Sequence, residues 1–212
     1  MMDLDETFDT LVLGIGNLLW ADEGFGVRVV EEMHRRFVFP PSVKLMDGGT
    51  QGLYLVQFVR QAKNLLVFDA IDYGDEPGSL RLVLDAEVPR FMGAKKMSLH
   101  QTGFQEVISA AELMGGAPAA MALIGVQAQE LEDWGGSLRP LIRDRIEPAI
   151  AMGLKILHDW GIDPVRRDSP LPADQELVGH DMDIRGYERT AAPTASASQG
   201  HPLQALFSQE SA

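Results

Sequence analysis

Four short polar segments carry the side chains of this chain that are best suited to chemistry. They contain Glu23, Asp47, Asp69 and His100, and each segment follows an apolar run or opens a helical pattern. If the apolar runs are parallel strands, their carboxyl ends meet at one edge of a sheet, and we expect the four segments to meet there. Glu23, Asp69 and His100 would then offer two carboxylates and an imidazole, a set suited to a divalent metal ion.

Each of these residues also has a purely structural interpretation. An acidic residue such as Glu23 is favourable in a first helical turn, and Asp47-Gly48 is a common turn dipeptide. Asp69 ends a buried strand, where a carboxylate needs a cap, a salt bridge or a metal to compensate its burial. A first-turn histidine such as His100 is often just exposed. The residues alone leave both interpretations open at every position.

The segment Gly14-Ile15-Gly16-Asn17 begins like a dinucleotide-binding fingerprint. The third glycine of that motif is missing, because Leu19 stands in its place, and two acidic residues follow where a pyrophosphate would be repelled. The alternative is that the glycines let the chain turn sharply after a buried strand. Nucleotide binding is therefore the weaker interpretation.

Composition limits the classes of protein that remain. The chain has 212 residues, 45% of them apolar, and a formal net charge of -13, which disfavours nucleic acid or anionic lipid as a partner. No run of 18 apolar residues is present, so no membrane span is expected. The absence of cysteine excludes disulfides, thiolate metal sites and a cysteine nucleophile. It also fits the cytoplasmic location that we expect.

Apolar periodicity predicts an α/β fold with five strands. The runs 10–16, 65–68 and 121–126 are apolar on both faces and belong in the middle of a sheet, whereas the short run 43–46 and the alternating run 80–84 belong at its edges. Pro77-Gly78 predicts a hairpin that makes strand four antiparallel. The result is a mixed five-stranded sheet of order 2-1-3-5-4 between two helical layers.

Helices are expected near residues 25–37 and 52–60, around residues 104–111 with Ser98 as the candidate N-cap, and from Ser137 to Leu157, where Pro148 should kink or split the last one. After residue 162 the apolar periodicity stops, and Pro, Ala, Ser, Gln and Asp dominate. We therefore expect one domain over residues 1–162 and a disordered or weakly ordered extension over residues 163–212.

The chain resembles the hydrogenase maturation endopeptidases, which trim the C-terminus of the large subunit of nickel–iron hydrogenases. The resemblance runs from about Thr10 to Gly161. It rests on six ordered blocks: Leu13-Gly14-Ile15-Gly16-Asn17, the run from Asp22 to Arg28, Asp47-Gly48-Gly49-Thr50, Asp69-Ala70-Ile71, His100-Gln101 and Glu147-Pro148-Ala149.

The resemblance implies a phosphorylase/hydrolase-like three-layer α/β/α fold and an aspartic-type peptidase by family classification. It implies metal binding by Glu23, Asp69 and His100, with Asp47 as a further acidic position, so the expected catalytic residues are Asp47 and Asp69. The metal would be nickel carried by the substrate, the precursor of the hydrogenase large subunit, and no organic cofactor is expected.

Two questions stay open at this level. Cleavage could proceed through a carbonyl or water activated by the metal, or through water activated by Asp47 or Asp69 as a base. The protein could also be a nickel-dependent binding or checkpoint factor in hydrogenase assembly that performs no catalysis.

Overall fold

The computed structural model describes residues 8–50, 52–93, 99–131, 133–134, 136–172, 175 and 177, except the side chains of residues 91–93 and 99–103. No helix in these segments is both long enough and apolar enough to cross a membrane.

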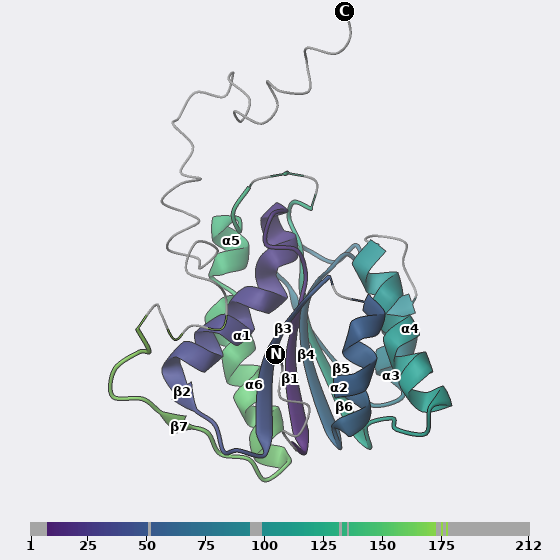
Figure 1. The fold of residues 1–212 in the computed structure, drawn as a ribbon. Helices are drawn as coiled ribbons and strands as arrows, with labels where there is room; N and C mark the ends of the chain where they lie inside the picture. Colours follow the sequence, from purple (N-terminus) through teal and green to yellow (C-terminus); the bar gives the residue numbers. More distant parts are fainter. Residues whose placement is uncertain are drawn as a thin grey trace, which may run out of the picture.

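A five-stranded mixed sheet forms the middle layer of the molecule (Figure 1). Its order is β3-β1-β4-β6-β5, and β5 runs antiparallel to β6 while the other neighbours are parallel. The strands are β1 (Thr10–Ile15), β3 (Val43–Gly49), β4 (Asn64–Ile71), β5 (Leu80–Leu84) and β6 (Ala120–Gln127). This order and these directions confirm the predicted topology.

Helices cover both faces of the sheet. One face carries η1 (Ala21–Gly24), α1 (Phe25–Arg36), α5 (Pro140–Arg143) and α6 (Ile146–Asp159); the other carries η2 (Gly52–Leu55), α2 (Val56–Gln61), α3 (Glu87–Gly93) and α4 (Leu99–Leu113). Each face has its own apolar core, because successive side chains of a strand point to opposite sides. Strand β1 is buried along its whole length, and β4 and β6 are buried beyond their first residue, as interior strands should be.

Several boundaries differ from the prediction. Strands β3 and β4 extend beyond the apolar runs of the sequence, so that Asp47 and Asp69 lie inside strands and not in the loops after them. The last helix is split before Ile146, as predicted for the region of Pro148, and Pro148 lies in the first turn of α6, where no N–H is needed for an intrahelical bond. Strand β5 lies at the sheet edge as predicted, but its buried side chain is Val83, and Leu82 and Leu84 are exposed. Helix α3 and the strand pair β2–β7 were not predicted.

The beginning of α1 lies directly against the backbone of β1 and β4. A Cβ atom placed on Gly26 would be 2.1 Å from the carbonyl oxygen of Phe68, and one on Gly14 would be 2.5 Å from the carbonyl oxygen of Gly26. A Cβ atom on Gly16, whose φ is +133°, would be 1.7 Å from the carbonyl oxygen of Glu23. Only glycine fits at these positions. The glycines serve backbone packing, which argues against the nucleotide-binding interpretation.

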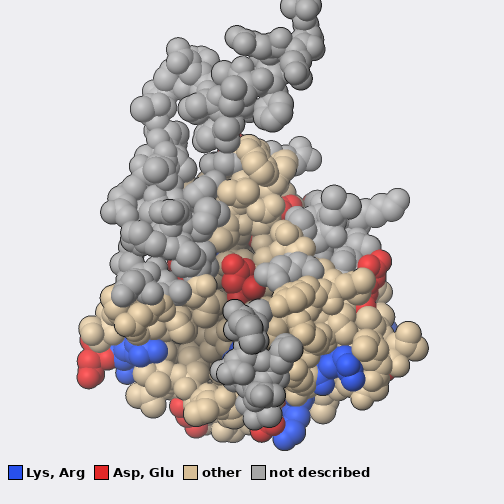
Figure 2. All heavy atoms as spheres, viewed as in Figure 1, with Lys and Arg blue, Asp and Glu red and all other residues tan. Residues whose placement is uncertain are grey.

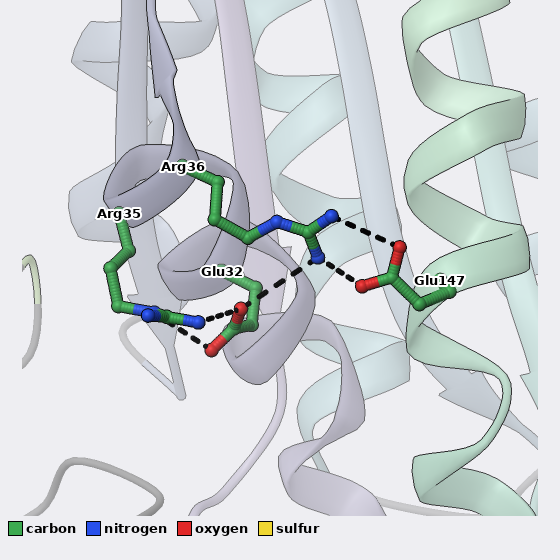
Figure 3. A network of polar contacts seen from close by, with 4 residues as sticks. All are labelled: Glu32, Arg35, Arg36 and Glu147. Carbon is green, nitrogen blue, oxygen red and sulfur yellow. Dashed lines mark hydrogen bonds and ion pairs between the residues drawn. The ribbon is translucent and has the colours of Figure 1, made fainter. Parts of the chain in front are cut away.

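A polar network joins the end of α1 to the beginning of α6 (Figure 3). The Arg36 guanidinium donates to both carboxylate oxygens of Glu147, and Arg35 donates to both oxygens of Glu32 at 3.0 and 2.6 Å. The hydrogen bond from Arg36 lowers the pKa of Glu147 below its ordinary value. The Glu147-Pro148 block of the sequence therefore has a structural role, since it fixes α6 against α1.

The chain stays in contact with the domain after residue 162. Strand β7 (Val165–Arg166) pairs antiparallel with β2 (Phe37–Val38), and the Leu171 N–H donates to the Arg35 carbonyl at 3.0 Å. Leu177 packs against the core beneath α1 and α6. The domain boundary at residue 162 stays a prediction, and residues 178–212 of the expected extension lie outside the described residues.

Replacing Gly26 tests the close approach of α1. We expect Gly26→Ala to lower the free energy of unfolding by about 3 kcal/mol or more, because the new methyl group meets fixed backbone atoms. Gly161→Ala is the matched control: Gly161 has φ +79° but open space around it, so the loss should be about 1–2 kcal/mol of backbone strain. Urea unfolding measures both, and equal losses would contradict the packing argument.

Candidate active site

The contact at Gly26 also places Glu23 near Asp69. Gly26 lies against the carbonyl of Phe68, the residue before Asp69, and Glu23 lies one helical turn before Gly26. The short helix η1 accordingly contacts β4. Glu23 and Asp69 therefore reach the same edge of the sheet, at the carboxyl ends of β1 and β4, where the sequence predicted them.

Glu23 is partly buried, and Asp69 is almost fully buried. Burial raises the pKa of Glu23 above its ordinary value. Asp69 is only 3% exposed, and its Oδ2 atom is buried without a hydrogen bond from the described residues, although the residue takes part in other contacts. Burial, with the negative charge of Asp69 as a second cause, raises the pKa of Tyr73 to about 12, so this phenol stays protonated. A cation would offset the desolvation of the carboxylates.

Asp47 approaches the same edge from β3. It pairs with Gly14 of β1, and the register then shifts so that Gly48 forms a bulge. Its Oδ1 atom accepts a hydrogen bond of 2.8 Å from the Gly49 N–H. Burial raises the pKa of Asp47, and the Gly49 hydrogen bond and the charge of the buried Arg28 oppose that rise.

His100 is the second residue of α4 and lies in its first turn, as the sequence predicted. It precedes Phe104 by one helical turn, and Phe104 lies beside Ile15 and Gly49 at the ends of β1 and β3. The His100 side chain is outside the described residues. Among the side chains that the structure does describe, no group of three metal-ligating residues is found. The three-residue metal site therefore stays a prediction.

Asp22 is a structural residue that the sequence reasoning missed. It is fully buried, and its carboxylate accepts three backbone hydrogen bonds of 2.8–2.9 Å from Gln129, Glu130 and Arg139. These bonds fix the loop after β6 against η1, and Trp20 and Trp134 pack edge to face across the same junction. Of these two adjacent acids, Asp22 thus stabilises the fold, whereas Glu23 is the candidate site residue.

Gln127 was also missed. This buried residue ends β6, accepts a hydrogen bond of 2.8 Å from the Tyr73 N–H and donates one of 3.0 Å to Asp72. Asp72 is therefore partly buried and hydrogen-bonded. A single polar residue at the end of an apolar strand was the available signal.

Figure 2 shows one side of the molecule, on which acidic atoms are exposed near the middle and the visible lysine and arginine atoms lie lower down. This distribution agrees with the net charge of -13 and favours cations.

Comparison with known proteins shows to which family the chain belongs. The chain matches the model of the hydrogenase maturation protease family, HycI, over residues 27–156. The chain belongs to this family. The matched segment contains Asp47, Asp69 and His100, and Glu23 lies just before it.

Individual relatives cover most of the protease. It is 60% identical over 182 residues to the hydrogenase expression/formation protein HupD of Bradyrhizobium diazoefficiens, covering 86% of this chain and 95% of HupD. It is 37% identical over 160 residues to the hydrogenase 2 maturation protease of Escherichia coli, covering 75% and 96%. The solved structure of the hydrogenase maturating endopeptidase HybD from Escherichia coli matches with a TM-score of 0.72 and 36% identity, over 76% of this chain and 98% of HybD. The protein is thus a hydrolase of the peptidase class, an endopeptidase of hydrogenase maturation.

Alanine replacements should separate the two adjacent acids. Asp22→Ala leaves three backbone N–H groups without their acceptor, and we expect it to lower the free energy of unfolding by about 3–5 kcal/mol. Glu23→Ala should change it by less than about 1 kcal/mol. Urea unfolding of both variants measures this, and the reverse order would contradict the assignment.

The pH dependence of stability tests the burial of Glu23. A raised pKa means that the folded state holds the proton more tightly than the unfolded state, so this contribution to stability is complete below the ordinary value of 4.5 and is lost as the pH rises through the folded pKa. Glu23→Gln removes the buried charge. Its melting temperature should exceed that of the unchanged protease at pH 7–8, and the gap should close toward pH 4. A gap that grows on acidification would contradict the argument.

Proposed function

We propose that the protease removes the C-terminal peptide of a nickel–iron hydrogenase large-subunit precursor after nickel has been inserted, and that it uses this nickel as its recognition element. Membership of the family supports the peptidase activity. The observation that supports the role of the ion is the placement of Glu23 and Asp69 at one sheet edge, in surroundings that penalise their negative charges. The expected cytoplasmic location, and the expected lack of nucleic-acid and membrane partners, stay predictions.

In this proposal Glu23, Asp69 and His100 ligate nickel that arrives with the substrate. Carboxylate oxygen and imidazole nitrogen suit a divalent first-row ion, and the ion removes the penalty of burying two acids. The nickel ion reaches these three ligands only when a nickel-loaded precursor binds. A precursor without nickel brings its peptide against buried carboxylates whose charge is not compensated, and its binding is therefore disfavoured.

Asp47 then serves as the general base. It takes a proton from a water molecule, the water oxygen bonds to the scissile carbonyl carbon, the carbon–nitrogen bond breaks, and the departing amine takes up a proton. The raised pKa of Asp47 suits a base that works near neutral pH. Asp69, the other carboxylate that the sequence suggested as a base, is almost fully buried, which favours its role as a ligand. Polarisation of the carbonyl by nickel supplies further activation.

Incubation with nickel-loaded precursor, followed by mass spectrometry, tests the proposal. The unchanged protease should release a C-terminal peptide, and Glu23→Ala, Asp69→Ala and His100→Ala should each abolish its release because the ion is no longer held. Nickel-free precursor should stay uncut. Normal processing by all three variants would reject the ligand assignment, and nickel-dependent binding without any released peptide would favour the checkpoint alternative.

The same assay separates the base from the ligands. Asp47→Asn should lower cleavage by about 100-fold or more while nickel-dependent binding of the precursor persists. Asp72→Asn is the matched control, since Asp72 lies after the same strand as Asp69 but is engaged by Gln127 and the Gly74 N–H. It should cleave at the normal rate.

A further inference from the structure

A small apolar hollow adjoins Asp47 at the site edge of the sheet. Strand ends, η2 and α4 form its walls, through Ile15, Gly49, Thr50, Gly52, Leu55 and Phe104.

The position of the hollow ties it to the reacting groups. Its wall residue Gly49 donates the hydrogen bond that holds Oδ1 of Asp47 at 2.8 Å, and the Gly49 carbonyl accepts a hydrogen bond of 3.1 Å from the Gly16 N–H. Phe104, on the opposite wall, follows His100 by one turn of α4. A peptide whose scissile bond lies beside Asp47 therefore has this hollow within one or two residues of that bond.

The size and chemistry of the hollow limit what it can hold. Its cavity volume is about 10 Å³, enough for about one water molecule or one methyl group. Three of its wall side chains, Ile15, Leu55 and Phe104, are each 2% exposed and belong to one packed core, so they cannot move aside without opening that core. A water molecule there finds few polar partners, whereas a methyl group loses none.

Building on the proposed function, we propose that this hollow is a specificity subsite that receives a small aliphatic side chain of the precursor, within two residues of the cleaved bond. The methyl group of alanine fits it, and valine fits it with one of its two methyl groups. The side chain of leucine exceeds the volume of the hollow. An aspartate carboxylate would lie against apolar side chains and close to the negative charge of Asp47. An apolar pocket of this kind discriminates about 10- to 200-fold per methylene group.

Substrate and enzyme are varied together to test this. The two residues on each side of the cleaved bond in nickel-loaded precursor are replaced one at a time by Ala, Val, Leu and Asp, and kcat/KM is measured for release of the peptide. We expect one position at which Ala or Val is at least 10-fold better than Leu and Asp.

Enlarging the hollow should then change the preference at that position. Leu55→Val and Leu55→Ala remove wall atoms, and each should improve relative cleavage of the leucine-containing precursor about fivefold or more. Ile108→Val is the matched control, because it takes one methylene group from the same core without lining the hollow, and it should keep the original preference. Thermal unfolding verifies that the variants fold, and Leu55→Val serves if Leu55→Ala does not.

The outcomes are distinct. If the unchanged protease releases no peptide from loaded precursor, the proposed function fails and the subsite falls with it. If it cleaves but shows no such position, or if Leu55→Val and Ile108→Val behave alike, the subsite is rejected while the proposed function stands.

Discussion

The close approach of one helix to two strands is the constraint on which the site depends. Gly14, Gly16 and Gly26 let the beginning of α1 touch the backbone of β1 and β4, at distances that no side chain permits. Because η1 precedes α1 directly, this contact carries Glu23 to the end of the strand that holds Asp69. The glycines that resemble a phosphate-binding motif therefore act here through steric fit between backbones. Their function is to bring two acidic side chains from different elements to one place.

A second set of interactions makes the neighbourhood of these acids rigid. Asp22 draws three backbone N–H groups of the loop after β6 onto η1, and Gln127 orders the turn after β4 through Tyr73 and Asp72. Buried polar groups of this kind are stable because they are satisfied. The functional acids differ: burial raises the pKa of Glu23 and of Asp47. The fold thus holds these acids where a negative charge is unfavourable, which is a common feature of functional sites, and in our proposal a cation relieves this cost.

The sequence predicted the sheet well because strand position depends on local pattern. Runs that are apolar on both faces identified β1, β4 and β6 as interior strands, and the Pro77-Gly78 link identified β5 as antiparallel. Where contacts between distant parts of the chain determine the secondary structure, the prediction from the sequence failed. Asp47 and Asp69 lie inside strands because neighbouring strands extend the pairing beyond the apolar runs. The pairing of β2 with β7 joins two short segments far apart in the chain, and no local pattern indicates it. Likewise, nothing in the pair Asp22-Glu23 says which acid turns inward.

The central claim is that Glu23, Asp69 and His100 hold one ion at the carboxyl edge of the sheet. A crystal structure of the protease soaked with Ni²⁺ or Zn²⁺ tests it most directly. We predict one ion with an oxygen of Glu23, an oxygen of Asp69 and a ring nitrogen of His100 each about 2.0–2.2 Å away. An ion bound elsewhere, or a His100 ring that stays beyond reach of both carboxylates, would contradict the account.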